Sequence, residues 1–113
     1  MEKVKSYREI ARDIINKLGT EKHFATSVIR YQVIIDDHSG NYLLFRNGRK
    51  GETRIYGCIV HIEVTDDGKV LLHQDSTDFI VADMMLEKGI PKQDIVLGFH
   101  APIMRADTEF SVG

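Results

Sequence analysis

The chain contains few of the residues from which many functional sites are built. Its 113 residues include a single cysteine, Cys58, and no tryptophan, and they carry a formal net charge of −2. One cysteine excludes an internal disulfide and any paired-cysteine metal motif, which fits a reducing cytoplasm. The nearly balanced charge argues against non-specific nucleic-acid binding by the whole molecule, although a local basic patch remains open.

Long apolar runs are missing as well. No stretch approaches the roughly 20 apolar residues that a helix needs to span a bilayer, and residues 1–5 begin a charged segment without the apolar core of a signal peptide. Hydrophobic residues make up 42% of the chain and charged residues 28%, as in ordinary globular proteins. We therefore expect one soluble, cytoplasmic domain over residues 1–113.

The hydrophobic pattern predicts an α+β fold. Residues 4–18 place apolar side chains at helical spacing, and Gly19 stands where a left-handed cap would end the helix. The next segments are rich in β-branched residues and are joined by short turns that contain glycine, which predicts a four-stranded antiparallel meander over residues 27–36, 41–48, 52–65 and 69–74. A second helix to about residue 88, a turn at 91–94, a short C-terminal strand at 95–99 and a tail at 102–113 should follow.

The turn at residues 66–68 sets the register of the third and fourth strands. With its glycine in the left-handed position of a three-residue loop, Glu63 faces Leu71 and His61 faces His73. The odd-numbered residues then share one face of the hairpin. The even-numbered residues would form the core face: Val60, Ile62, Val64, Val70 and Leu72.

Two imidazoles and a carboxylate on one sheet face could ligate a divalent cation. Structural zinc normally takes four ligands, however, and no compact motif in the sequence supplies them. We therefore favour a polar face that is solvated or covered by a partner, and we predict no metal and no cofactor. A small metal-dependent hydrolase using His61, His73 and an acidic residue is the least favoured function.

Catalytic constellations are not evident elsewhere in the sequence. Cys58 shares the parity of Val60 and Ile62, which predicts a buried core thiol and not a nucleophile. Asp75 and Asp78 suit the start of the second helix. The sequence therefore predicts a protein that is not an enzyme.

Four cations gather around the turn between the second and third strands: Arg46, Arg49, Lys50 and Arg54. If Gly48 pairs with Glu52, Arg46 and Arg54 are cross-strand neighbours. Like charges placed opposite each other reduce stability, so this pairing would favour an anionic partner such as the DNA backbone or an acidic protein. Turns are commonly charged, however, and we favour a solvated turn over such a contact. A DNA-binding accessory factor that uses these four residues is our second hypothesis.

Three separated motifs carry a family resemblance: RIYGCIVHI at 54–62, QDSTD at 74–78 and GIPKQDIVLGFHAP at 89–102. Residues 7–10 and 105–112 are similar as well. Together they resemble the XisI family, the fdxN-element excision controlling factors of cyanobacteria, over essentially the whole chain.

The resemblance implies a protein that controls excision of a DNA element during heterocyst development. Such proteins are typically encoded beside a second small protein, XisH, which is nuclease-like. Our leading hypothesis is a non-enzymatic accessory factor that binds an XisH-like partner, and a homodimer is compatible with it. The binding surface would be the mixed polar and apolar second face of the sheet, with residues Ile59, His61, Glu63, Leu71 and His73.

Overall fold

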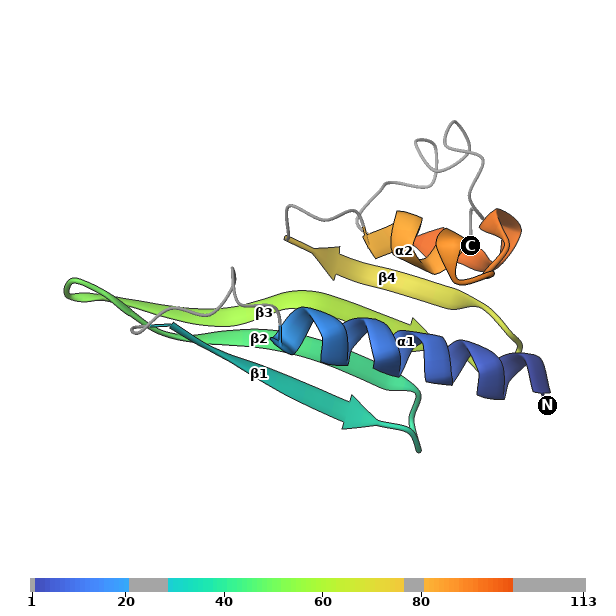
Figure 1. Ribbon diagram of the computed structural model, residues 1–113, viewed down its shortest axis with the longest axis horizontal. Helices are drawn as coiled ribbons and strands as arrows, with labels where there is room; N and C mark the ends of the chain where they lie inside the picture. The colour runs from blue at the N-terminus through green and yellow to red at the C-terminus, as the bar shows by residue number, and fades with distance from the viewer. Residues whose placement is uncertain (1, 21–28, 77–80, 99–113) are drawn as a thin grey trace.

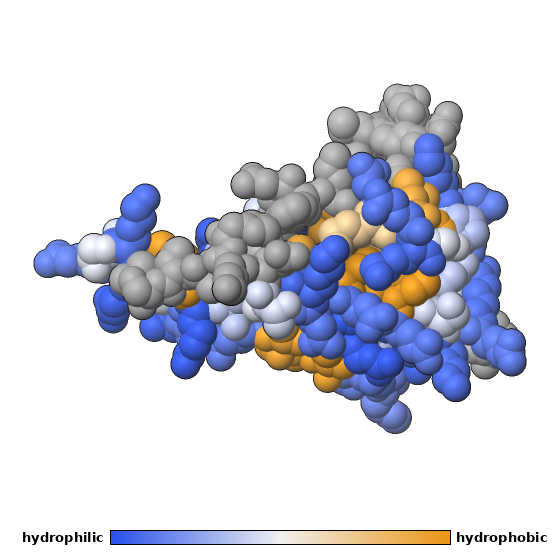
Figure 2. All heavy atoms as spheres, in the orientation of Figure 1, coloured by the Kyte–Doolittle hydropathy of each residue, from blue (hydrophilic) through white to orange (hydrophobic). Residues whose placement is uncertain are grey.

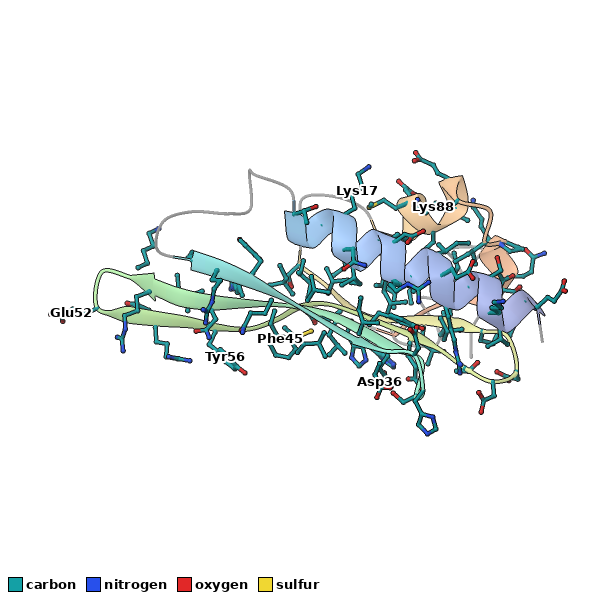
Figure 3. All side chains as sticks on the ribbon, turned by 60° about the horizontal axis from the view of Figure 1, so that its bottom comes forward. Lys17, Asp36, Phe45, Glu52, Tyr56 and Lys88 are labelled. Carbon is teal, nitrogen blue, oxygen red and sulfur yellow. The ribbon has the colours of Figure 1, made fainter. Side chains whose placement is uncertain are left out.

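One five-stranded sheet organises the chain, with both α-helices on one of its sides (Figure 1 and Figure 3). The structure, a computed structural model, describes residues 2–20, 29–76 and 81–98. The elements in chain order are α1 (Glu2–Thr20), β1 (Ile29–Asp36), β2 (Asn41–Lys50), β3 (Thr53–Val64), β4 (Val70–Asp75), α2 (Val81–Glu87), the 3₁₀ turn η1 (Lys92–Asp94) and β5 (Ile95–Leu97).

The predicted α+β architecture is confirmed. Strands β1 to β4 pair antiparallel in sequence order, as a meander does. The short C-terminal strand, whose place the sequence did not predict, joins the same sheet: β5 lies parallel to β4, and Ile95 pairs with Val70. A parallel neighbour requires a crossover connection, and the segment containing α2 provides it. The N-terminal part of the second predicted helix and the predicted tail fall outside the described residues.

The expected cap at Gly19 was wrong, because α1 continues through this residue to Thr20. A Cβ atom at Gly19 would clash with Cγ2 of Val33 on β1. The glycine therefore lets the end of α1 approach the sheet closely, and it does not terminate the helix. No helix among the described residues is long and apolar enough to cross a membrane.

The hydrophobic core lies between the helices and the sheet. The predicted core face of the β3–β4 hairpin is confirmed, since each of its five residues is at most 1% exposed. From the helical side, α1 packs Ile14, Ile15 and Leu18 into the same cluster, and α2 adds Val81 and Met85. One side of the sheet is thus covered by α1 and α2 and forms the hydrophobic core.

A buried carboxylate ties α1 to the turn before β5. The hydroxyl of Tyr7 donates to Asp94 Oδ2 at 2.6 Å, and Lys3 Nζ lies 3.0 Å from the same oxygen. Lys69 Nζ donates to the Gln93 carbonyl at 2.9 Å and adds a second cation. Burial alone would raise the pKa of Asp94, but the hydrogen bonds from Tyr7 and Lys3 and the two cations lower it overall. Burial, reinforced by Asp94, raises the pKa of Tyr7 to about 12.

We expect Asp94→Asn to lower the free energy of unfolding at neutral pH by about 1–3 kcal/mol, because charge-assisted hydrogen bonds are lost. A carboxyl group with a depressed folded-state pKa stabilises the fold above its ordinary pKa of 3.8, and this contribution disappears as the pH falls through the lower folded-state value. Urea unfolding at pH 7 and at acid pH measures both effects. Asp83→Asn, at an exposed site on α2, is the matched control, and equal losses in the two variants would contradict the assignment.

Candidate functional site

The side of the sheet opposite α1 and α2 forms a mixed polar and apolar surface, which we call the open face. Figure 3 shows two of its labelled side chains, Phe45 and Tyr56, pointing away from the helices. Paired residues share a face, so the strand register assigns the others. The open face contains Ile34, Leu43, Phe45, Tyr56, Cys58, His61, Glu63, Leu71 and His73.

A β-bulge in β3 changes which residues reach the open face. Phe45 pairs with Cys58 but Leu44 pairs with Val60, so Ile59 is the extra residue. An extra residue reverses the alternation of side chains along a strand. Ile59 is consequently 5% exposed and belongs to the core, so its predicted place on the partner-binding face was wrong. Cys58, predicted as a core thiol, lies half-buried on the open face instead.

A second irregularity lies where β3 meets β4. The predicted pairing of Glu63 with Leu71 is confirmed, but His61 pairs with Gln74 and not with His73. The register shift leaves His73 as the extra residue of β4. The two imidazoles nevertheless stand side by side, with ring centroids 4.7 Å apart. The sequence therefore predicted the neighbourhood correctly and its register wrongly.

The histidines are held in a polar network. His61 Nε2 donates to Asn41 Oδ1 at 2.8 Å, and His73 Nε2 donates to Glu63 Oε1 at 2.8 Å. Burial, and secondly the neighbouring His73, lower the pKa of His61, while Glu63 acts in the opposite direction. His61 is therefore neutral at neutral pH. Within residues 2–20, 29–76 and 81–98, no three histidine, cysteine or acidic side chains are arranged to hold a metal ion.

In the folded chain we expect the imidazole of His61 to titrate below 6.5, its ordinary pKa, in an NMR titration. His73→Asn removes the repulsive neighbour, so the pKa of His61 should rise in that variant. It should remain below 6.5, because burial is the larger cause. A midpoint at or above 6.5 in the unmodified chain would contradict the burial of this ring. The urea-unfolded chain supplies the reference titration.

The described surroundings of Cys58 do not activate its thiol as a nucleophile. Its Sγ donates to the carbonyl oxygen of Val60 at 3.2 Å, and burial raises the pKa of the thiol. Because the thiolate is the reactive form, a raised pKa reduces the reactive fraction of this thiol at neutral pH.

The structure revises the predicted pairing of the four cations. Gly48 pairs with Ile55, and Lys50 pairs with Thr53, which leaves a two-residue loop where a longer one was expected. The residue directly opposite Arg54 is consequently Arg49, and not Arg46. Gly51 at φ 64° enables this tighter turn.

Four apolar members of the open face were not predicted from the sequence: Ile34, Leu43, Phe45 and Tyr56. A signal for them exists, because Leu43 and Leu44 are adjacent, as are Val33 and Ile34 on β1. Apolar residues at both parities of a strand are typical of a sheet that is covered on both faces.

Comparisons with known proteins agree on one family. The sequence model described as XisI protein matches residues 1–112. The crystal structure of a XisI-like protein from Anabaena variabilis is 30% identical, with a TM-score of 0.88 over 97% of this chain and 99% of that one. The fdxN element excision controlling factor XisI from the same organism is 33% identical, with a TM-score of 0.82 over 98% and 99% of the two chains. A search of curated proteins gave no match.

Proposed function

Because this chain belongs to the XisI family, we propose that it is a non-enzymatic accessory factor that controls excision of a DNA element by binding a nuclease-like, XisH-type protein. The name of one structural relative, an fdxN element excision controlling factor, supports the role in excision. The partner would supply the nuclease activity, and this chain would restrain or direct it.

The observation that carries the binding role is the open face itself. Both described α-helices pack on the other side of the sheet, yet the open face carries large apolar side chains. Ile34 is 45% exposed and Tyr56 is 59% exposed. Leu43 lies between Ile34 and His61 in the strand register. Phe45 packs beside Tyr56, and Leu71 lies on β4 on the other side of Glu63. A surface that combines apolar groups with satisfied polar groups is typical of interfaces between proteins that also exist separately.

The chemistry of the described residues supports a non-enzymatic role. His61 is neutral and engaged by Asn41, and the hydrogen bond of Cys58 goes to a backbone carbonyl. A nucleophile needs a base within hydrogen-bond reach, and neither group provides such a pair. The open face is therefore better suited to recognition than to catalysis.

Co-purification of the untagged chain with a tagged XisH-type protein encoded beside it tests this proposal. We expect a stoichiometric complex, and nuclease assays with and without this chain then give the sign of its effect. Light scattering of the chain alone measures any homodimer that has to dissociate first. The absence of a complex at micromolar concentrations would overturn the proposal.

A further inference from the structure

The hairpin of β2 and β3 extends well beyond the rest of the fold. Figure 1 shows it reaching past α1, α2 and β4, and in Figure 3 Glu52 marks its tip. We call residues 45–58 the arm. β4 ends at Asp75, which pairs with Val60, and β1 begins at Ile29, which pairs with Gly48. Over residues 45–48 β1 still pairs with β2, so among the described residues the two-stranded ribbon is the end of the arm, residues 49–54.

Both faces of the arm carry exposed cations, and all of them except Arg46 lie on the two-stranded end. Arg49 and Arg54 are directly paired on the face that continues the open face. Arg46 and Lys50 alternate with Arg49 along β2 and therefore point to the opposite face. Figure 2 shows hydrophilic residues at the end of the arm.

These positive charges are not neutralised within the described chain. None of the four cations forms an ion pair with a described carboxylate. Residues 45–58 contain a single acidic residue, Glu52, although the whole chain has a net charge of −2. The arm is thus a positive projection on an otherwise acidic molecule. Its directly paired arginines repel each other until an anion lies between or beside them.

The arm also positions one of its arginines. The guanidinium of Arg54 lies 5.2 Å from the centre of the Tyr56 ring, and that ring packs at 5.9 Å from Phe45. An arginine resting on an aromatic face loses less freedom when it binds, because the ring already restricts its rotamers. The side chain of Arg54 is therefore pre-organised to bind a ligand at the end of the arm.

We propose that the arm enters a groove of double-stranded DNA and contacts phosphates with both of its faces. The major groove of B-form DNA is about 12 Å wide and admits a two-stranded β-ribbon between two phosphate-lined walls. A ribbon with cations on both faces fits this geometry, whereas a flat anionic surface would use only one face. The deep, narrow major groove of A-form RNA does not admit such a ribbon. The proposal does not depend on the protein partner.

Fluorescence anisotropy with a labelled DNA duplex, without any partner protein, tests this inference. Two double variants neutralise the faces separately: Arg49→Gln with Arg54→Gln, and Arg46→Gln with Lys50→Gln. Each should reduce duplex affinity at least about tenfold near 100 mM salt, and each should reduce the slope of log K against log salt by about 2. Single-stranded DNA and double-stranded RNA should bind more weakly than the duplex.

The matched control is Lys17→Gln with Lys88→Gln, which removes the same charge from the helical side of the molecule (Figure 3). This control should retain duplex affinity to within about threefold, because screened charges act over about 10 Å at 0.1 M salt. The proposal would be overturned if the chain did not bind the duplex at low salt or bound single strands more tightly. It would also be overturned if the control lost as much affinity as the double variants, or if only one of the two double variants lost affinity. Thermal melting of each variant verifies that the fold is kept. Failure here leaves the partner-binding proposal untouched, because the DNA assay contains no partner protein and the co-purification contains no DNA.

Discussion

Replacing Leu71 by lysine is expected to weaken the complex with the XisH-type partner by about 30-fold or more. Leu71 lies half-buried on the open face, next to the histidine network. A charge forced into the dry centre of an interface costs about 2 kcal/mol or more, and 1.4 kcal/mol corresponds to a factor of ten in affinity. Isothermal titration calorimetry of the partner with each variant measures the loss.

The lysine is chosen to spare the fold. Leu71 pairs directly with Glu63, so a cation at this position faces a carboxylate across the strands, whereas aspartate would face a like charge. Lys17→Glu, on the exposed side of α1, changes the charge on the opposite side of the sheet and should leave the affinity unchanged. Unchanged affinity in Leu71→Lys, with the fold intact, would remove the open face from the interface.

Gly40→Ala is expected to lower the free energy of unfolding by about 3 kcal/mol or more. Gly40 ends the turn between β1 and β2 with φ 76°, and an added Cβ atom would overlap the backbone carbonyl oxygen of Val64. That backbone cannot retreat, because the amide of Val64 donates to the carbonyl of Gly40 at 2.8 Å. Urea unfolding of the variant gives the loss directly.

Gly51→Ala separates the cost of a left-handed backbone from the cost of a steric clash with the added Cβ atom. Gly51 also has a positive φ, 64°, but an added Cβ atom at this position meets nothing within 4 Å. Only the left-handed backbone penalty of about 1 kcal/mol should remain. If Gly40→Ala and Gly51→Ala lowered the free energy of unfolding by similar amounts, the close approach of Gly40 to β3 would make no contribution to stability.

Periodicity was sufficient to predict the elements of this fold. Alternation fixed the core face of β3 and β4, and glycine-containing turns fixed the meander, because both depend on residues close in sequence. The pairing of β5 with β4 depends on a contact across α2, which no local pattern encodes. Gly19 shows the same limit: its role comes from Val33 on another strand, and not from the helix that contains it.

The candidate site was predicted in part for a related reason. A strict two-residue alternation assigns His61, Glu63, Leu71 and His73 to one face, and the structure places them together. The bulge at Ile59 breaks this alternation and exchanges the positions of Ile59 and Cys58. One extra residue in a strand leaves no mark on composition, so the exchange becomes visible only from the register with β2.

The central claim is that the open face contacts the partner protein, and methyl NMR of the chain titrated with that protein tests it most directly. We predict that the methyl signals of Leu43 and Leu71 shift or broaden when one equivalent of the partner protein has been added. Those of Leu18, which is buried under α1 on the other side of the sheet, should stay in place. A saturated complex in which the signals of Leu43 and Leu71 do not change would contradict the claim.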